Sequence, residues 1–313
     1  MFLSRFVPQE TQARIRISAD AGMLPTMKGE RLKIAIVGAG NLGSALSVSL
    51  HAARYVVSEI VAREGTTSWR KARLLARKVG ARVTALHKPE ITANLVWFCV
   101  PDCGIAACAR ELADAISWKR KIAVHSSGAL ASDEIAGLRN CGAWIASVHP
   151  LMTFVPGVTP SLRGVSFAVE GDAAALRTIR GIVRVLGGRT YPIRKEDKAA
   201  YHAWGTFVSP LLTALLATSE KVAQTAGVVR RTARRRMLPI VRQTVENYAK
   251  QGGARGFSGP IVRGDAETIE AHLKVLRGIP EAQEVYRALA AAALKTLPTK
   301  NRGRLQKVLR SSG

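Results

Sequence analysis

Lys198 and His202 are the pair of side chains in this sequence that could most directly carry out chemistry. They are four residues apart in a stretch that is typical of a helix, so they share one face of it. An ammonium group can stabilise developing negative charge, and an imidazole can exchange a proton near neutral pH. Together they could position a carbonyl or an imine and move a proton. A solvated lysine and a helix histidine with satisfied hydrogen bonds are the alternative.

Residues 38–43, which read GAGNLG, could bind the phosphates of a dinucleotide. They follow an apolar run at 32–37 and precede a helix-like stretch at 44–53. A strand, a glycine turn and a helix in this order are the context in which such a motif predicts a nucleotide site. A structural turn without a ligand is the alternative.

Each glycine of this turn has a distinct physical role. Gly38 allows the tight turn, Gly40 lets a pyrophosphate approach the backbone, and Gly43 lets the helix pack closely on the strand. Asn41 and Leu42 lie where the helix begins, so their N–H groups and the positive end of the helix dipole would face the phosphates.

Arg63 decides which dinucleotide we expect. NAD-binding turns place an Asp or Glu at the end of the second strand, for the ribose hydroxyls. In this chain that position holds Arg63, which suits a 2′-phosphate, and Glu64 comes one residue later. The sequence therefore predicts NADP, with NAD as the less favoured cofactor.

Polar residues follow several other predicted strands, and ligands of open α/β sheets bind beyond the carboxyl ends of the strands. We expect Ser126, Ser127 and His149 beside the nicotinamide, where the serines could orient a substrate. The strand end formed by Val100, Pro101 and Asp102, together with Ser127, is expected to contact the cofactor.

These residues are positioned by an alternating pattern of strands and helices that extends to about residue 193. The pattern predicts an N-terminal Rossmann-type, doubly wound parallel sheet, followed by an all-helical C-terminal domain. We expect a flexible extension at 1–30, a dinucleotide-binding domain at 31–193, and a helical substrate and dimerisation domain at 194–313. Within the helical part, 252–264 is predicted to be a glycine-rich loop and 300–313 a basic tail.

The sequence resembles the 6-phosphogluconate dehydrogenase-like superfamily of two-domain reductases. More narrowly, it resembles bacterial Rossmann-like proteins with a C-terminal domain of unknown function 2520. The matching stretches are IAIVGAGNLG, WFCVPD, VHSSGAL, SVHPLMTF, KAAYHAW and GPIVRGDAETIEAHL. The resemblance implies a nucleotide-binding domain and a helical domain that usually dimerises, without a settled substrate.

Two groups of relatives imply roles for single residues. In β-hydroxyacid dehydrogenases a Lys and an Asn one turn later flank the reacting carbon. Lys198 corresponds to that Lys, and His202 stands where the Asn would be. Prephenate dehydrogenases carry a His-Pro like His149-Pro150. Arg263 and Asp265 belong to a family pattern, and Arg263 could bind an acidic substrate or bridge a dimer interface.

The composition limits the partners. With 47 Lys+Arg against 22 Asp+Glu, the net charge is +25, which would attract nucleic acid, anionic membrane or phosphorylated ligands. The charge is spread along the chain, so we expect a solvated basic surface and no specific nucleic acid. The densest cluster, which also lacks interleaved aromatic residues, consists of Arg230, Arg231, Arg234, Arg235 and Arg236.

The remaining features point to a cytoplasmic protein. Four cysteines match no zinc signature, so we expect reduced thiols and no metal. The stretch 199–218 is better explained as a helix buried in protein than as a membrane span. The sequence thus predicts a cytoplasmic, homodimeric, NADP-dependent oxidoreductase that acts on a small, anionic carbonyl, imine or hydroxy compound. A non-catalytic NADP(H) sensor or scaffold is the alternative.

Overall fold

The computed structural model describes residues 26–27 and 30–311. Contacts divide the chain into two units, which we call the sheet unit (Met1–Gly205) and the helical unit (Thr206–Gly313). Most of the predicted extension at 1–30 lies outside the described residues, and the predicted boundary at 193/194 stays a prediction. No helix among the described residues is both long and apolar enough to cross a membrane.

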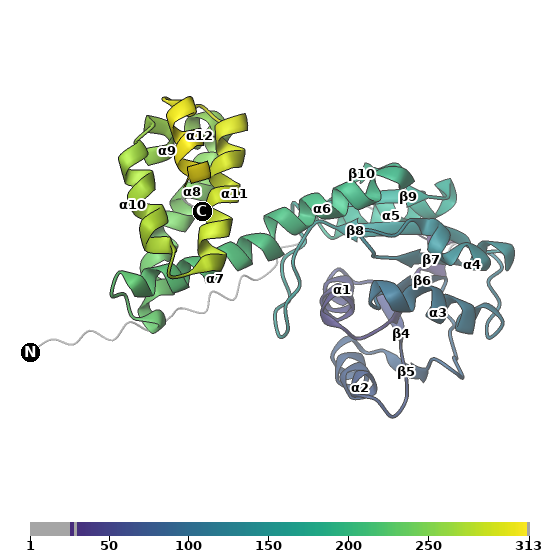
Figure 1. Cartoon of the computed structure of the whole chain (residues 1–313). Helices are drawn as coiled ribbons and strands as arrows, with labels where there is room; N and C mark the ends of the chain where they lie inside the picture. The colour runs from purple at the N-terminus through teal and green to yellow at the C-terminus, as the bar shows by residue number, and fades with distance from the viewer. Residues whose placement is uncertain (1–25, 28–29, 312–313) are drawn as a thin grey trace, which may run out of the picture. The chain divides into compact units, whose positions relative to one another are not determined.

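The sheet unit contains a twisted sheet of eight strands (Figure 1). Its three central strands contain continuous apolar runs, IAIV, LVWF and IAV, as expected where both faces are covered. Two short strands, β1 (Thr26–Met27) and β2 (Glu30–Arg31), pair separately. The strands of the large sheet are β3 (Lys33–Val37), β4 (Val56–Ala62), β5 (Arg82–Ala85), β6 (Leu95–Phe98), β7 (Ile122–His125), β8 (Trp144–Pro150), β9 (Ser166–Gly171) and β10 (Arg189–Pro192).

The order of the strands places a topological switch point between β3 and β6. The sheet order is β10-β9-β8-β7-β6-β3-β4-β5, so the chain runs outward from β3 to β5 and then returns to β6 beside β3. In doubly wound sheets this reversal leaves a crevice at the carboxyl ends of the two central strands, where ligands bind. The predicted Rossmann-type sheet is confirmed.

The sheet is mostly parallel, and β8 and β9 form its one antiparallel pair. Residues 151–165 connect these two strands without a helix that could carry the chain back across the sheet. The chain therefore turns round at this point, and β9 and β10 run opposite to the other strands.

Helices cover both faces of the sheet and bury a separate core on each. One core joins the strands to α1 (Asn41–Ala52), α2 (Thr67–Val79) and α5 (Ala173–Val185). The other joins them to α3 (Asp102–Ala113), the 3-10 turn η1 (Ser132–Ile135) and α4 (Ala136–Asn140). In Figure 1 the two sets of helices lie on either side of the sheet.

A 3-10 turn, η2 (Lys195–Asp197), leads into α6 (Lys198–Val208), and the helical unit begins within α6. Pro210 occupies the first position of α7, where a proline loses no helix hydrogen bond. The helices of this unit are α7 (Pro210–Thr225), α8 (Arg230–Gly256), α9 (Pro260–Arg263), α10 (Ala266–Leu276), α11 (Pro280–Thr296) and α12 (Arg302–Ser311).

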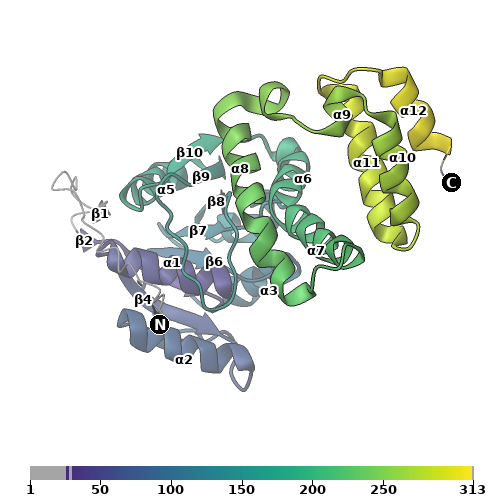
Figure 2. The ribbon, with the colours of Figure 1, turned by 90° about the vertical axis from the view of Figure 1, so that its left-hand side faces the viewer.

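Two details of the helical unit differ from the sequence prediction. The helix α8 continues past Gly252, which introduces a kink at φ +72°, and α9 occupies part of the predicted loop. The predicted basic tail contains α12, because Leu305 and Val308 face a small core shared with α10 and α11. Figure 2 shows these three helices side by side.

Candidate functional site

The glycine turn has the geometry of a phosphate-binding loop. Gly38 lies at φ +102°, and a Cβ there would lie 2.9 Å from the carbonyl oxygen of Cys99. A Cβ on Gly43 would lie 2.1 Å from the carbonyl oxygen of Gly38. No side chain caps α1, whose N-cap residue is Gly40. The turn therefore needs glycine at both positions and leaves the start of α1 able to bind an anion.

The two predicted cofactor residues at the start of α1 lie in different surroundings. Asn41 is exposed, and its Nδ2 donates to the carbonyl oxygen of Phe154, 3.2 Å away. Leu42 is partly buried against the core of the sheet unit. The loop after β8 thus lies over the first residue of α1.

The end of β6 borders this turn. The Val100 Cγ1 atom lies 2.9 Å from the position that a Cβ of Gly38 would take, so this side chain covers the turn. Pro101 is the N-cap residue of α3, and Asp102 is the first residue of that helix. The predicted residues Val100, Pro101 and Asp102 therefore lie along one side of the glycine turn.

Arg63 follows directly after β4 and is exposed. Its backbone carbonyl accepts a hydrogen bond from Thr66 Oγ1, which fixes the start of α2. Its competitor Glu64 is exposed too, with a carboxylate oxygen 4.0 Å from His87 Nε2. Burial raises the pKa of the Cys108 thiol, and the positive charge of Arg63 opposes that rise.

Lys198 is the central buried group of the candidate site. Only 1% of it is exposed. Its Nζ donates to the carbonyl oxygen of Ser127 at 3.0 Å and to Ser147 Oγ at 2.6 Å. Burial lowers the pKa of Lys198 to about 8, although the charges of Glu170 and Asp102 oppose that shift. Such an amine can hold or release a proton near neutral pH.

The two predicted serines are engaged within the protein. The Ser127 hydroxyl donates to the Asp102 carboxylate at 2.9 Å and accepts the backbone N–H groups of Ala129 and Leu130. The Ser126 hydroxyl accepts from Trp97 Nε1 at 2.8 Å. Both hydroxyls therefore stabilise the loop after β7 through bonds within the protein.

His149 and His202 face one another across Gly128. Their ring centroids are 6.2 Å apart. A Cβ on Gly128 would lie 2.7 Å from His202 Cδ2 and 2.9 Å from His149 Nε2, so any larger residue would displace one of the two rings. Burial, followed by the charges of Lys198 and His202, lowers the pKa of His149 to about 4. His149 is therefore neutral at physiological pH, whereas His202 is exposed to solvent.

The structure brings most of the predicted catalytic residues together and adds others. Lys198, Ser127, His149 and His202 form one cluster, while Ser126 points to Trp97. The residues that sequence reasoning did not assign are Ser147, Tyr201, Gly128 and Glu170. Tyr201 contacts His149 Nδ1 at 2.7 Å, and Glu170 binds Ser132. Ser147, within an apolar strand, gave no signal, whereas Gly128 lay in a motif that the sequence analysis had quoted.

The remaining polar residues singled out in the sequence lie in the helical unit. Over the described residues, no three His, Cys, Asp or Glu side chains form a group that could hold a metal ion. Arg263 in the helical unit pairs with Asp265 at 2.8 Å. In the arginine cluster, Arg234 pairs with Glu220 at 2.9 Å.

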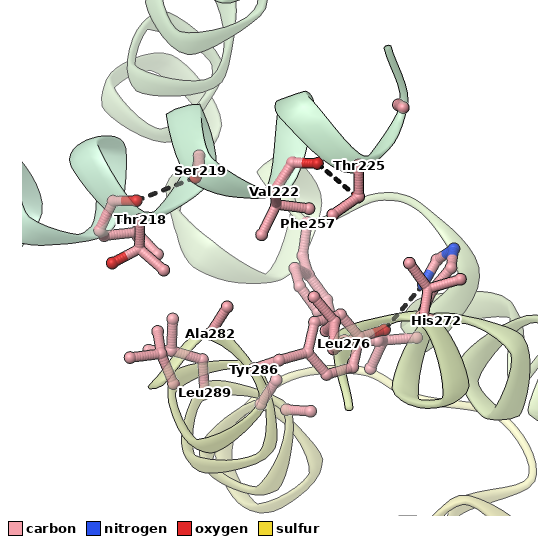
Figure 3. A pocket seen from close by; sticks show the side chains of 17 residues that line it. Thr218, Ser219, Val222, Thr225, Phe257, His272, Leu276, Ala282, Tyr286 and Leu289 are labelled. Carbon is pink, nitrogen blue, oxygen red and sulfur yellow. Dashed lines mark hydrogen bonds between the residues drawn. The ribbon is translucent and has the colours of Figure 1, made fainter. Parts of the chain in front are cut away.

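The helical unit has a hollow of its own, of about 600 Å³. Most of the side chains that line it are apolar, and they come mainly from α7, α10 and α11 (Figure 3). Its main polar pair is His272 with Tyr286, whose Nδ1 and hydroxyl oxygen are 3.0 Å apart. The hydroxyls of Ser219 and Thr225 donate to backbone carbonyls of their own helix. The hollow thus lacks the reactive groups of the cluster around Lys198.

Comparison with protein-family models identifies both parts of the chain. Residues 18–150 match the model of a Rossmann-like domain, and residues 165–293 match the model of a domain of unknown function, DUF2520. A comparison with curated proteins found no significant match.

Solved structures share the fold. A proposed NADP oxidoreductase of Bacteroides fragilis superposes with a TM-score of 0.71 at 20% identity, covering 84% of this chain and 97% of its own. The Thermotoga maritima protein TM1727 gives 0.64 at 23% identity, with 89% and 98% covered. A reductive aminase of Aspergillus terreus, in complex with NADPH and ethyl-5-oxohexanoate, gives 0.61 at 17%, with 89% and 98% covered. At these identities the likeness establishes the fold.

Proposed function

We propose that this chain, a Rossmann-like domain followed by a DUF2520 domain, is an NADP-dependent oxidoreductase. It transfers hydride to or from a small, anionic carbonyl, imine or hydroxy compound. One observation carries the proposal: contacts link the glycine turn to a buried amine. Val100 covers Gly38, and two residues later the Asp102 carboxylate accepts a hydrogen bond from the Ser127 hydroxyl. The backbone carbonyl of Ser127 accepts one from Lys198 Nζ.

The turn fits a dinucleotide by its own geometry. The glycines at 38 and 43 let the tight turn form, because a Cβ at either position would strike the backbone, and the uncapped start of α1 offers N–H donors to a pyrophosphate. Arg63 would hold the 2′-phosphate through charge-assisted hydrogen bonds. When bound, the nicotinamide ring supplies or accepts the hydride. The relatives named as an NADP oxidoreductase and as a reductive aminase with NADPH support this assignment.

The remaining chemistry falls to the chain's own side chains. An ammonium has three donors, and the bonds to Ser127 and Ser147 use two of them. Lys198 can therefore hold a substrate oxygen or nitrogen and stabilise negative charge on it. His202, exposed at the edge of the cluster, can exchange the proton with solvent.

Cofactor binding is the first test. Nucleotide at a hundred times its dissociation constant adds about 2.7 kcal/mol to stability, and we expect a melting-temperature rise of roughly 5 °C with NADP or NADPH. The Arg63→Ala variant should lose the preference over NAD, since a hydrogen bond to a charged group contributes about 1.5–3 kcal/mol. A wild-type protein that responds to neither nucleotide at millimolar concentration contradicts the proposal.

Turnover is the second test. With a substrate found by screening a metabolite panel against NADPH oxidation, Lys198→Ala and His202→Ala should each lower turnover at least about tenfold, the low end for a positioned acid or base. Their affinity for NADPH should stay close to that of the wild type. Lys71→Ala is the matched control, because Lys71 is an exposed lysine of α2.

A non-catalytic NADP(H) sensor or scaffold is the second candidate. The hydrogen bonds of Lys198 and Ser127 favour it, because they are formed within the protein and give both side chains a structural role without a substrate. A sensor would bind NADPH, with the thermal shift above, and would oxidise it with no compound of the panel. Turnover with any member of the panel excludes this candidate.

We also propose that the chain forms a homodimer through the helical unit. The apolar hollow of Figure 3 and the exposed side chains of Leu211, Leu212 and Leu289 support an apolar interface there. Light scattering at micromolar concentration should return twice the mass of one chain, which is 33.6 kDa. A monomer under these conditions would contradict the proposal.

The cytoplasm is the compartment that we propose for this protein. The four cysteines are free in the structure, and two of them, Cys99 and Cys108, are buried. Free buried thiols suit a reducing compartment. Cell fractionation of a tagged chain should recover it with cytoplasmic markers, and recovery in an oxidising compartment would contradict this assignment.

A further inference from the structure

Two histidines of the sheet unit, the buried His125 and the partly buried His149, differ in how their ring nitrogens are used. His125 Nδ1 accepts the backbone N–H of Ser127 at 3.2 Å, and its Nε2 lies 3.0 Å from the carbonyl oxygen of Ala131. A carbonyl oxygen can only accept, so His125 carries its proton on Nε2. Both nitrogens of this ring are thus used within the chain, and His125 acts as part of the core.

His149 has one such bond, and its other nitrogen lies at the candidate site. Its Nδ1 is 2.7 Å from the Tyr201 hydroxyl oxygen. Its Nε2 lies beside Gly128, on the side where His202 also approaches that glycine. The proton on the ring therefore decides whether the site presents a donor or an acceptor at Nε2.

The Tyr201 hydroxyl is expected to donate in this pair. Burial, followed by the neighbouring Tyr191, raises the pKa of Tyr201, so its proton is retained. The unprotonated nitrogen of a neutral imidazole is a stronger acceptor than a phenol oxygen, so the phenol proton is best used on Nδ1. This arrangement leaves the single proton of the neutral imidazole on Nε2.

We propose that Tyr201 is a positioning residue that fixes His149 as the tautomer protonated on Nε2, so that the site presents a neutral N–H donor beside Gly128. This inference rests on the proposed function. In it, the Nε2–H group donates a hydrogen bond to a carbonyl or carboxylate oxygen of the substrate. A neutral N–H donor can bind such an oxygen. It offers no acceptor to a substrate that carries an ammonium group at this position. His202 comes next to Tyr201 in α6, so one helix both fixes the donor and supplies the exposed imidazole.

Nitrogen-15 NMR of the full chain, labelled at histidine and measured at pH 7.5 without ligand, tests the proposal. Long-range proton–nitrogen correlations distinguish the two neutral tautomers directly. We expect His149 and His125 to appear as single Nε2–H tautomers in the wild type. Tyr201→Phe should convert the His149 signal to a mixture of tautomers and leave His125 unchanged, so that His125 reports on the fold. A wild-type His149 protonated on Nδ1 overturns the proposal, even if the variant fails to fold.

Tyr191→Phe is the matched control. Its ring packs edge-on against that of Tyr201, with centroids 6.2 Å apart, and its hydroxyl has no hydrogen-bond partner among the described residues, so we expect the variant to keep the Tyr201–His149 pair. The His149 tautomer should therefore stay as in the wild type. If Tyr191→Phe shifts the tautomer as much as Tyr201→Phe does, general packing determines it and the proposal is wrong.

The same samples separate this inference from the proposed function. NADPH should raise the melting temperature of the wild type whichever tautomer His149 adopts. A missing thermal shift with an Nε2–H tautomer contradicts the oxidoreductase and leaves the role of Tyr201 standing. A normal thermal shift with an Nδ1–H tautomer contradicts the role of Tyr201 alone.

Discussion

The sheet unit buries and pairs several charged side chains, whereas the helical unit keeps its ion pairs at the surface and exposes large apolar side chains. In the sheet unit, charged groups are buried and paired inside the unit: Lys198 with Ser127 and Ser147, Glu170 with Ser132, and Glu59 with Thr92. In the helical unit, ion pairs such as Lys221–Glu281 and Arg234–Glu220 lie at the surface, and large apolar side chains such as Ile240 and Leu289 are exposed.

This difference shows where each unit obtains its stability. The sheet unit has an apolar core on each face of its sheet and can satisfy its own buried polar groups. The helical unit has a small core between α10, α11 and α12, together with an apolar hollow lined by α7, α10 and α11. Substitutions in the sheet unit should therefore change folding, and substitutions on the helical surface should change association.

The largest effect on folding is expected from Gly43→Ala. The new Cβ would lie 2.1 Å from the backbone oxygen of Gly38, so the turn itself must move. We expect a loss of about 4 kcal/mol or more in the free energy of unfolding, a range reached when the backbone is displaced. Gly137→Ala is the control, because no atom lies within 4 Å of its added Cβ and alanine favours α4. Urea unfolding measures both, and equal stabilities would contradict the geometry of the turn.

The next effect is the dependence on pH at Lys198. Its pKa is about 8 in the folded protein and about 10.4 when unfolded, so the unfolded chain binds more protons between these values. Stability then rises with pH from 8 to 10.5, by up to roughly 3 kcal/mol from this group. The Lys198→Met variant lacks the titrating amine, so its free energy of unfolding should rise by that much less between pH 8 and 10.5. Urea unfolding at the two pH values gives the difference, and parallel curves for the two proteins would show that Lys198 is not buried as described.

The partly buried His149 should make stability depend on pH in the acid range. Burial lowers the pKa of His149 to about 4, whereas the unfolded value is about 6.5. The unfolded chain binds more protons between these values, so stability is lost as the pH falls through about 6.5. At pH 5 the cost from this group is about 2 kcal/mol relative to pH 8. His149→Asn should reduce the loss by that amount in urea unfolding, and an unchanged loss would contradict the burial of this ring.

The sequence predicted the sheet better than it predicted the site, for a physical reason. Strands such as Leu95–Phe98 and the glycine turn after β3 are encoded locally, by continuous apolar runs and by glycine spacing. The partners of Lys198, by contrast, lie 51 and 71 residues away along the chain. Ser147 is one serine in an apolar strand, and only the pairing of β7 with β8 brings it to the loop after β7.

The same limit explains two features that the sequence did not predict. The reversal of β9 depends on a connection without a helix, which the strand pattern alone did not reveal. The helix α12 is basic along most of its length, and its few apolar residues form a core only with α10 and α11. Long-range packing decided both cases.

The smallest effect on folding, and the sharpest test of the comparison, is expected from Leu289→Ser. Leu289 lines the hollow of the helical unit and is 50% exposed, so its loss should change the free energy of unfolding by no more than about 0.5 kcal/mol. In a symmetric dimer the same side chain counts twice, and burying a leucine contributes about 1.5–3 kcal/mol. The dissociation constant of the dimer should therefore rise at least about tenfold.

Leu74→Ser is the matched control in the sheet unit, because Leu74 is 66% exposed on α2 and the predicted interface excludes it. Sedimentation velocity at micromolar concentration should show dissociation for Leu289→Ser and none for Leu74→Ser. If both variants dissociate equally, or neither does, the exposed apolar side chains of the helical unit do not form the interface, and the contrast between the two units fails at this point.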